Sequence, residues 1–516
     1  MHAGHCRVLL TTGTNEHGRW QQKMNGPSGT AAQLNNLNHV FKPRSVAFVG
    51  ATEGMPKWGF VVFNNIICGG FEGKLYPVNP SRETVAGHKC YPTVGAIPDD
   101  VDLAVFTVPS RSVISALDDC VAKGVKAAVV ITAGFKELGD EGAALQAKIV
   151  ARASAAGIAL VGPNGEGVSC PSSAFYSWMP IFYPKPGPIS VVAQSGNILN
   201  MLIGHGLDSG FGLSKGVSSG NEAQLKTEDY LCYFADDPDT DVMVSYVEGI
   251  EDGQHFFELA RRATSRKPVV MLKGGRSNTG MRAAMSHTGA MAVSDRVFES
   301  ACRQAGIVLA RSIRDAGITA ASFVKRPLPQ GKRVGIVTGG GGLGVIAADA
   351  CANFGLEVPR FSRETLEKIA GYLPDYFVPG NPVDLVAGLD LTVLKPIVET
   401  VMRSGEVDSV MFIFVESQRN KGPNLQEFGG TGVDMGLFWD AAMEAVHPHL
   451  EELNVLAREI GIPLYFTANV DSGGITGEEF MNGDSPMIFK EVEASCAAIS
   501  AMAQYHEYLE HSRGGG

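Results

Sequence analysis

The sequence predicts an α/β protein that contains several doubly wound parallel sheets. Its length of 516 residues exceeds what one hydrophobic core organises and predicts roughly three to four domains. The composition, 45% hydrophobic and 19% charged with 62 glycines, is typical of α/β proteins, in which glycine-rich turns join strands to helices. Short apolar, β-branched runs alternate with helix-length segments, and such runs form parallel strands buried on both faces.

The first domain is expected to follow an irregular N-terminal segment. Residues 1–40 are rich in Asn, Gln, Gly and His, and because they lack apolar periodicity we expect a poorly ordered extension. Near-continuous apolar strands follow at 45–50, 103–108 and 127–132. These strands predict a first domain over residues 41–180.

Two proline-rich stretches mark the expected domain boundaries. One spans residues 180–188 with four prolines, and the other spans residues 326–332. After each boundary a strand restarts and runs into a turn of small residues. We therefore expect a second domain over residues 188–327 and a third over residues 332–508, each a doubly wound sheet that binds ligands outside the carboxyl ends of its strands.

Charge and cysteine content exclude several functional classes. The net charge of −11 and the absence of a Lys/Arg run argue against a nucleic-acid-binding surface. The nine cysteines include no CxxC pair, which favours reduced thiols and a cytoplasmic location over a disulfide framework or a metal site. No apolar stretch approaches the roughly 20 residues that span a bilayer, and the N-terminus lacks the apolar core of a signal peptide. We expect no contact with a membrane.

The first small-residue turn, Gly50-Ala-Thr-Glu-Gly54, precedes a helix of about a dozen residues, whose N-terminus favours an anion. The turn is not a GxGxxG motif, so it is compatible either with a nucleotide-like ligand or with a purely structural role. Four further strand-end loops are expected at the same sheet edge, where together they favour a cofactor crevice. These loops span residues 77–82, 108–110, 131–135 and 161–164.

A second group of candidates could handle a phosphoryl group. His287 lies in Ser286-His-Thr-Gly-Ala290, where small neighbours allow close approach to an imidazole that carries phosphate, although most of the twelve histidines must be ordinary surface or core residues. Ser195 and Gly196 precede another expected helix and could receive that phosphate. Glu248 ends an apolar strand and is either a solvated carboxylate or the group that fixes the tautomer of the histidine.

Ten segments, taken in order, carry a resemblance to a known family. From about residue 44 to 415 the chain resembles the α part of ADP-forming acetyl-CoA synthetase and, more distantly, the α subunit of succinyl-CoA synthetase. The segments are SVAFVGAT, GKLYPVNPSRETVAGHKCYPTV, VDLAVFTVPS, KGVKAAVVITAGFKELGDEG, GIALVGPNGEG, ISVVAQSG, YVEGIEDG, KPVVMLKGGR, SHTGAMA and GNPVDL.

The resemblance implies a Rossmann-like CoA-binding domain followed by two flavodoxin-like domains. It implies the interconversion of acyl-CoA, ADP and phosphate with a small carboxylic acid, CoA and ATP through an acyl phosphate and a phosphohistidine. Coenzyme A and phosphate would bind this chain, whereas ATP or ADP with magnesium would bind an ATP-grasp β subunit in a hetero-oligomer. The partner is expected because the sequence beyond residue 505 is too short for an ATP-grasp domain and no Walker A motif occurs.

The resemblance also implies roles for individual residues. His287 occupies the position of the phosphohistidine, Glu248 that of its supporting carboxylate, and Ser195 and Gly196 that of the turn that holds the phosphate. The positions implied for CoA binding are Gly50, Ala51, Thr52, Gly54, Arg82, Val108, Pro109, Ile131, Thr132, Ala133 and Asn164.

Departures from the family pattern leave the acyl group open. Glu166 follows Pro163-Asn-Gly165 where the family has Pro-Asn-Cys before a glycine, and residues 220–226 lack the two aspartates of the family. Residues 415–475 match no expected pattern, and we expect an elaborated loop and helix there, near an interface. Alternative functions are a CoA-binding regulatory protein and a CoA-dependent lyase or transferase. An NAD-type oxidoreductase is disfavoured because GxGxxG is absent.

Overall fold

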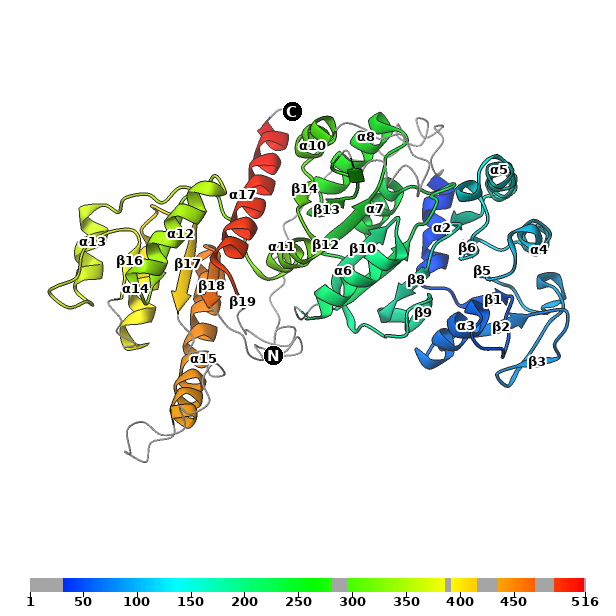
Figure 1. Ribbon diagram of the computed structural model, residues 1–516, viewed down its shortest axis with the longest axis horizontal. Coiled ribbons are helices and arrows are strands. Elements are labelled where there is room, and N and C mark those ends of the chain that lie inside the picture. The colour runs from blue at the N-terminus through cyan, green and yellow to red at the C-terminus, as the bar shows by residue number, and fades with distance from the viewer. Residues whose placement is uncertain are drawn as a thin grey trace, which may run out of the picture. The chain divides into compact units, whose positions relative to one another are not determined.

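Figure 1 shows the structure of the chain, a computed structural model. The chain divides into two compact units. The first unit comprises residues 1–168, 177–179 and 219–233, and the second comprises 169–176, 180–218 and 234–516. The described residues are 31–208, 210, 212–277, 279–280, 295–385, 391–414, 435–468 and 487–514.

A five-stranded sheet with the order β2-β1-β5-β6-β7 forms the centre of the first unit, and its paired strands all run parallel. Every residue of β1, β5, β6 and β7 is buried, as near-continuous apolar runs predict. The strands are β1 (Ser45–Val49), β2 (Lys74–Val78), β5 (Leu103–Phe106), β6 (Ala127–Val130) and β7 (Ala159–Val161), with a small antiparallel pair β3 (Thr84–Val85) and β4 (His88–Lys89). The helices are α2 (Ala31–Phe41), α3 (Trp58–Cys68), α4 (Ser110–Lys123) and α5 (Asp140–Ala155).

Helix α2 corrects the expectation of a poorly ordered extension through residue 40. Leu37, Val40 and Phe41 of this helix are fully buried, and the Phe41 ring stacks on Tyr233 at a centroid distance of 5.5 Å. The Asn36 amide donates a hydrogen bond to the Gly157 carbonyl at 2.9 Å. The first domain therefore begins before residue 40, because the apolar face of α2 completes its core.

Two further sheets lie wholly or largely in the second unit; the first has seven strands in the order β14-β13-β12-β10-β11-β8-β9, of which β8 and β9 are each divided between the two units. The pairs from β11 to β14 are parallel. Its strands are β8 (Gly167–Cys170), β9 (Phe175–Trp178), β10 (Pro186–Ala193), β11 (Leu213–Ser218), β12 (Val242–Val247), β13 (Val269–Lys273) and β14 (Val308–Ala310). Its helices are α6 (Gly196–Asp208), α7 (Thr227–Asp236), α8 (Gly253–Thr264), α10 (Asp295–Gln304) and α11 (Ile313–Lys325). Residues 219–233, which hold most of α7, group with the first unit.

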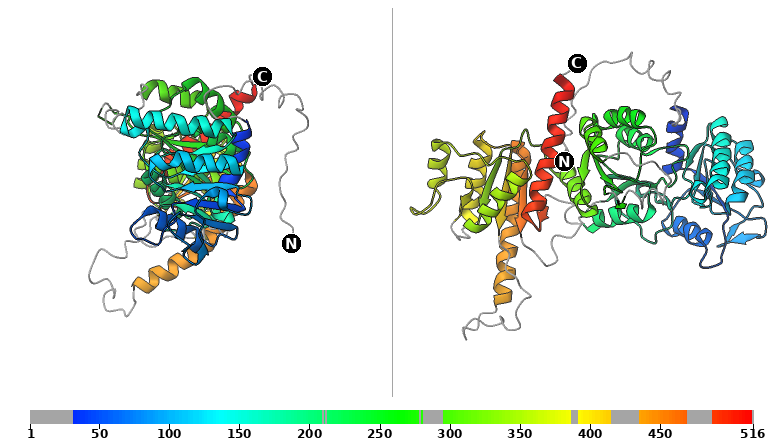
Figure 2. Two further views of the ribbon diagram at one scale, coloured as in Figure 1. Left: turned by 90° about the vertical axis from the view of Figure 1, so that its right-hand side faces the viewer. Right: turned by 45° about the horizontal axis from the view of Figure 1, so that its top comes forward.

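The third sheet has the order β16-β15-β17-β18-β19 and is parallel throughout. Helices cover both of its faces (Figure 2), because Val410 and Phe412 face a core shared with α14 and α15 while Met411 and Ile413 face a core shared with α12 and α17. The elements are β15 (Val334–Thr338), β16 (Val383–Asp384), β17 (Ser409–Phe414), β18 (Leu464–Ala468), β19 (Ile488–Phe489), α12 (Gly341–Asn353), α13 (Arg363–Ala370), α14 (Leu391–Arg403), α15 (Met435–Ile460) and α17 (Val492–Gly514). Helix α15 lies in the segment where an added loop and helix were expected; residues 415–434 are outside the described part of the chain.

The three sheets share one topology, which confirms the predicted doubly wound α/β class. In each, the first strand of the parallel series (β1, β10 or β15) lies between the second and the third strand. The chain thus winds one way from this strand and then the other, and ligands bind at such a reversal in doubly wound sheets.

A buried ion pair stabilises the second sheet. The Nζ atom of Lys215, whose side chain is fully buried, lies 2.5 Å from Oδ2 of Asp237, and the Thr240 hydroxyl donates to the same oxygen at 2.6 Å. Burial opposes ionisation of Asp237, but the hydrogen bonds from Lys215 and Thr240 outweigh it and hold the pKa of Asp237 below its ordinary value. Asp237 is therefore ionised at neutral pH.

We predict that Asp237→Asn destabilises the second unit by about 3 kcal/mol, because it leaves the Lys215 ammonium buried without its counter-ion. Asp239→Asn is the matched control: its carboxylate lies 3.8 Å from the same ammonium and is 40% exposed, so the loss should stay below about 1 kcal/mol. Because the folded pKa of Asp237 is lowered, its contribution is present above the ordinary Asp pKa of about 3.9 and is lost as the pH falls through the folded value. Thermal unfolding at pH 7 and pH 3 measures both effects, and equal losses in the two variants would contradict the assignment.

Candidate functional site

The turn after β1 fits an anion at the reversal of the first sheet. Gly50 has a φ of 101°, in the left-handed region that favours glycine, and an added Cβ would lie 2.7 Å from Oγ1 of Thr107. At Gly59 an added Cβ would lie 2.2 Å from the Gly50 carbonyl oxygen, so α3 packs directly on the turn. The first amides of α3 have no partners within the helix and therefore favour an anion at this edge.

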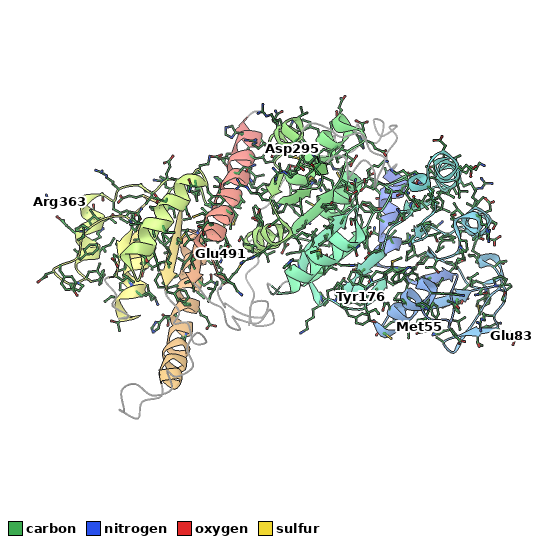
Figure 3. All side chains as sticks on the ribbon, in the orientation of Figure 1. Met55, Glu83, Tyr176, Asp295, Arg363 and Glu491 are labelled. Carbon is green, nitrogen blue, oxygen red and sulfur yellow. The ribbon has the colours of Figure 1, made fainter. Side chains whose placement is uncertain are left out.

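The loop after β2 lies beside this turn. The Asn79 amide donates to the Ala51 carbonyl at 2.9 Å, and the guanidinium of Arg82 lies 3.9 Å from the Glu53 carboxylate. The Thr52 hydroxyl accepts a hydrogen bond from the Gly54 amide at 3.2 Å. Met55, labelled in Figure 3, follows the turn with 69% of its surface exposed.

The loops after β5, β6 and β7 continue the row. An added Cβ at Gly50 would lie 3.0 Å from Cγ1 of Val108. The Thr132 hydroxyl donates to the Val108 carbonyl at 2.7 Å, and the backbone N–H of Asn164 donates to the Thr132 carbonyl at 3.0 Å. Pro109 is the N-cap residue of α4. Ile131 and Ala133 flank Thr132 directly in sequence. The structure thus brings the predicted cofactor residues into one row of contacting loops along one sheet edge.

In the second unit, Gln194 connects the predicted phosphate turn to Glu248. Its side-chain oxygen accepts hydrogen bonds from the backbone N–H groups of Glu248 at 2.6 Å and Gly249 at 3.3 Å, and its Nε2 donates to the Gly249 carbonyl at 3.0 Å. Ser195 follows Gln194 directly, and α6 begins at Gly196. The sequence placed Gln194 in this turn without assigning it a role, although a polar residue at the end of an apolar strand is a signal that could have pointed to one.

The Glu248 carboxylate has a donor on its own strand. The Tyr246 hydroxyl lies 3.4 Å from Oε1 of Glu248, and burial, followed by the charge of Glu248, raises the pKa of Tyr246 to about 12. Tyr246 therefore stays protonated at neutral pH, and its hydroxyl can donate a hydrogen bond to one oxygen of the Glu248 carboxylate.

His287 lies outside the described residues, but the helix that follows its segment is held by ion pairs. Asp295, labelled in Figure 3, begins α10, and its carboxylate lies 3.3 Å from Nζ of Lys273 and 3.5 Å from Nε of Arg276. Arg276 also pairs with Glu299 at 2.5 Å. These contacts fix the start of α10 to the end of β13, the strand after Glu248.

A third glycine turn opens the third sheet. Residues 339–342 follow β15, and added Cβ atoms at Gly339, Gly340 and Gly342 would meet nothing within 4 Å.

Over the described ranges, no three or more His, Cys, Asp or Glu side chains gather closely enough to hold a metal ion. The same ranges contain no helix with the length and apolar character needed to cross a bilayer.

We predict that Gln194→Ala accelerates hydrogen exchange of the Glu248 and Gly249 amides by about tenfold or more, because each loses its acceptor. Gln254→Ala is the control, since Gln254 donates only at the exposed surface of α8, to Glu258 at 3.3 Å. Exchange measured by mass spectrometry should change in the first variant alone. Unchanged exchange in Gln194→Ala would show that the Gln194 side chain does not hold the residues that follow β12.

Three stretches of the chain match models of known domains. Residues 44–171 match a CoA binding domain, residues 186–323 a succinyl-CoA ligase like flavodoxin domain, and residues 334–416 a ligase-CoA domain. The chain also superimposes on the dinucleotide forming acetyl-coenzyme A synthetase 1 of Ca. Korarchaeum cryptofilum, solved in complex with phosphate and ADP, with a TM-score of 0.78 and 31% identity. That match covers 93% of this chain and 99% of the other.

Two curated relatives differ in length. The chain is 37% identical to the ADP-forming acetate–CoA ligase of Methanocaldococcus jannaschii, a match that covers 68% of this chain and 49% of the relative, so the chain spans about half of that protein. It is 36% identical to the α subunit of the ADP-forming acetate–CoA ligase I of Pyrococcus furiosus, with 74% of this chain and 83% of that subunit covered. These matches confirm the resemblance drawn from the motifs: the chain belongs to the family of ADP-forming acetate–CoA ligases.

Proposed function

We propose that this chain is the CoA-binding and phosphoryl-carrying part of an acyl-CoA synthetase. The reaction interconverts acyl-CoA, ADP and phosphate with a carboxylic acid, CoA and ATP. The observation that carries the proposal is the row of contacting loops along the edge of the first sheet, from Arg82 to Asn164, centred on the glycine turn after β1. The match of this chain to an α subunit, which covers 83% of that subunit, supports the same assignment.

The row suits coenzyme A in two respects. The turn at residues 50–54 and the N-terminus of α3 would hold the pyrophosphate, because helix N-terminal amides favour anions. The loops that contain Val108, Thr132 and Asn164 would line the path of the pantetheine arm. Bound CoA would supply the thiol that accepts the acyl group.

Phosphoryl transfer belongs to the second unit in this proposal. A carboxylate is a poor acyl donor, so forming an acyl phosphate first divides one difficult step into two easier ones. His287 would carry the phosphoryl group, and Glu248 would accept a hydrogen bond from the N–H of the other ring nitrogen, which fixes the tautomer and leaves the nucleophilic nitrogen unprotonated. The Tyr246 hydroxyl donates a hydrogen bond to one oxygen of Glu248. The backbone N–H groups at Ser195 and Gly196 would stabilise the phosphate charge.

An ATP-grasp β subunit that binds ATP or ADP with magnesium completes the proposed enzyme. Relatives occur both as separate α subunits and as longer single chains. The proposed ATP-grasp part can therefore be a separate subunit or a further domain of the same chain. The eight described cysteines are free thiols, which suits the proposed cytoplasmic location.

We predict that [³²P]phosphate labels the protein in the presence of its acyl-CoA and that His287→Ala abolishes the label. The reaction then runs from acyl-CoA through acyl phosphate to phosphohistidine and does not require nucleotide. The label should be acid-labile and alkali-stable, and the acyl-CoA that gives the most label identifies the acid. A panel of acetyl-, longer aliphatic, hydroxylated and aromatic acyl-CoAs covers the choice left open at Glu166 and residues 220–226.

Glu248→Gln should lower the labelling rate by about a hundredfold, because a neutral amide oxygen is a weaker hydrogen-bond acceptor than a carboxylate and cannot stabilise positive charge on the imidazole. Glu251→Gln, an exposed position three residues away, is the control and should label like the wild type. If no acyl-CoA gives label even with an ATP-grasp partner present, the synthetase function is wrong. Binding of CoA without any label would then favour a regulatory CoA-binding protein.

A further inference from the structure

A half-buried carboxylate, Glu137, and a buried amide, Asn221, link the loops after β6 and β7 of the first sheet. Oε1 of Glu137 accepts hydrogen bonds from the backbone N–H groups of Gly134 at 2.5 Å and Phe135 at 3.0 Å. Its Oε2 accepts from Nδ2 of Asn221 at 2.6 Å. Burial opposes ionisation of Glu137, but the hydrogen bonds, that of Asn221 first, hold its pKa below the ordinary value. The loop after β6 is therefore folded around an ionised carboxylate.

Asn221 uses every polar atom of its side chain. Besides Glu137, Nδ2 donates to Oε1 of Gln146 at 3.0 Å, and Oδ1 accepts from Nδ2 of Asn164 at 3.2 Å. Its backbone N–H donates to the Pro163 carbonyl at 2.8 Å. With 8% of its surface exposed, Asn221 has no polar atom left for a ligand, so its role is to hold its neighbours.

The neighbouring glycine shows how closely this segment is seated on the loop after β7. An added Cβ at Gly220 would lie 2.3 Å from the Pro163 carbonyl oxygen and 2.6 Å from that of Asn164. Asn164 itself has a φ of 62°, a conformation that L-residues adopt at a cost. The hydrogen bonds of Asn164 to Asn221 and Thr132 therefore stabilise a backbone shape that this loop would not keep by itself.

The position of the network in the sheet identifies the part of the cofactor it serves. Strands β6 and β7 are the second and third strands from β1, and at about 4.8 Å a strand they lie roughly 10 and 14 Å from the anion-binding turn. If the nucleotide of the ligand lies on the β2 side of that turn, its pantetheine arm lies at the loops that Glu137 and Asn221 hold.

We propose that Glu137 and Asn221 are positioning residues that shape the loops at 131–136 and 162–166 to receive the pantetheine end of the cofactor. This inference rests on the proposed CoA-binding function. The two residues act through the loop backbones and do not touch the ligand. Their complementarity is specific, since one side chain must accept and the other donate.

The test uses calorimetric titration of the whole chain with two probes, CoA and adenosine 3′,5′-bisphosphate, which lacks the pantetheine arm. Asn221→Asp sets a carboxylate against Glu137, and Glu137→Gln sets one amide N–H₂ group against another. Each single substitution should weaken CoA binding about tenfold and leave bisphosphate binding unchanged. The double variant Glu137→Gln/Asn221→Asp restores one acceptor and one donor at the contact and should recover most of the CoA affinity.

The outcomes separate this inference from the function on which it rests. If the wild type does not bind CoA, both fail. If the wild type binds CoA and the single variants bind it equally well, or the double variant is weaker than both singles, the positioning role alone fails. Retained bisphosphate binding shows that a variant is folded; if Asn221→Asp loses it, Asn221→Ser, which removes the amide without adding charge, replaces it under the same criteria.

Discussion

Because parallel strands deliver their carboxyl ends to a single edge, the reversal of strand order beside the first strand determines where each candidate site lies. At β1 the reversal separates the loop after β2 from the loop after β5, so the glycine turn at Gly50 is left open between them. At β10 the same reversal places Gln194 beside the end of β12, which Glu248 directly follows. The two candidate sites thus share one backbone arrangement and differ in the side chains at the strand ends.

Close backbone packing makes this arrangement rigid. The contact between Gly59 and the Gly50 carbonyl, and that between Gly220 and the Pro163 carbonyl, admit no side chain. At each point a polar loop lies against a helix start or a second loop without an intervening layer of apolar groups. Hydrogen bonds supply the cohesion that hydrophobic contact supplies elsewhere. The side-chain amides of Asn79 and Gln194 bond to backbone groups, and that of Asn221 bonds to three other polar side chains.

The sequence was informative where short-range patterns determine structure. Apolar runs located the strands, and the small-residue turns located the carboxyl end of the first strand of each parallel series, because both features depend on a few adjacent residues. Helix α2 was missed because only Leu37, Val40 and Phe41 form its apolar face within an Asn-rich segment. Glu137 and Asn221 were not identified because their contact joins residues 84 positions apart, and no local pattern distinguishes them from solvated polar residues.

Residues 219–233 show why domain boundaries along the chain and compact units in space need not agree. Strand β11 pairs with β10 as far as Ala193 and Ser218, and the next residue already belongs to the first unit. Asn221, three residues after β11 ends, is hydrogen-bonded to the loops after β6 and β7. The chain therefore passes from β11 of the second sheet to Asn221 within three residues, so one continuous segment first completes a parallel sheet and then holds two loops of the first unit by hydrogen bonds.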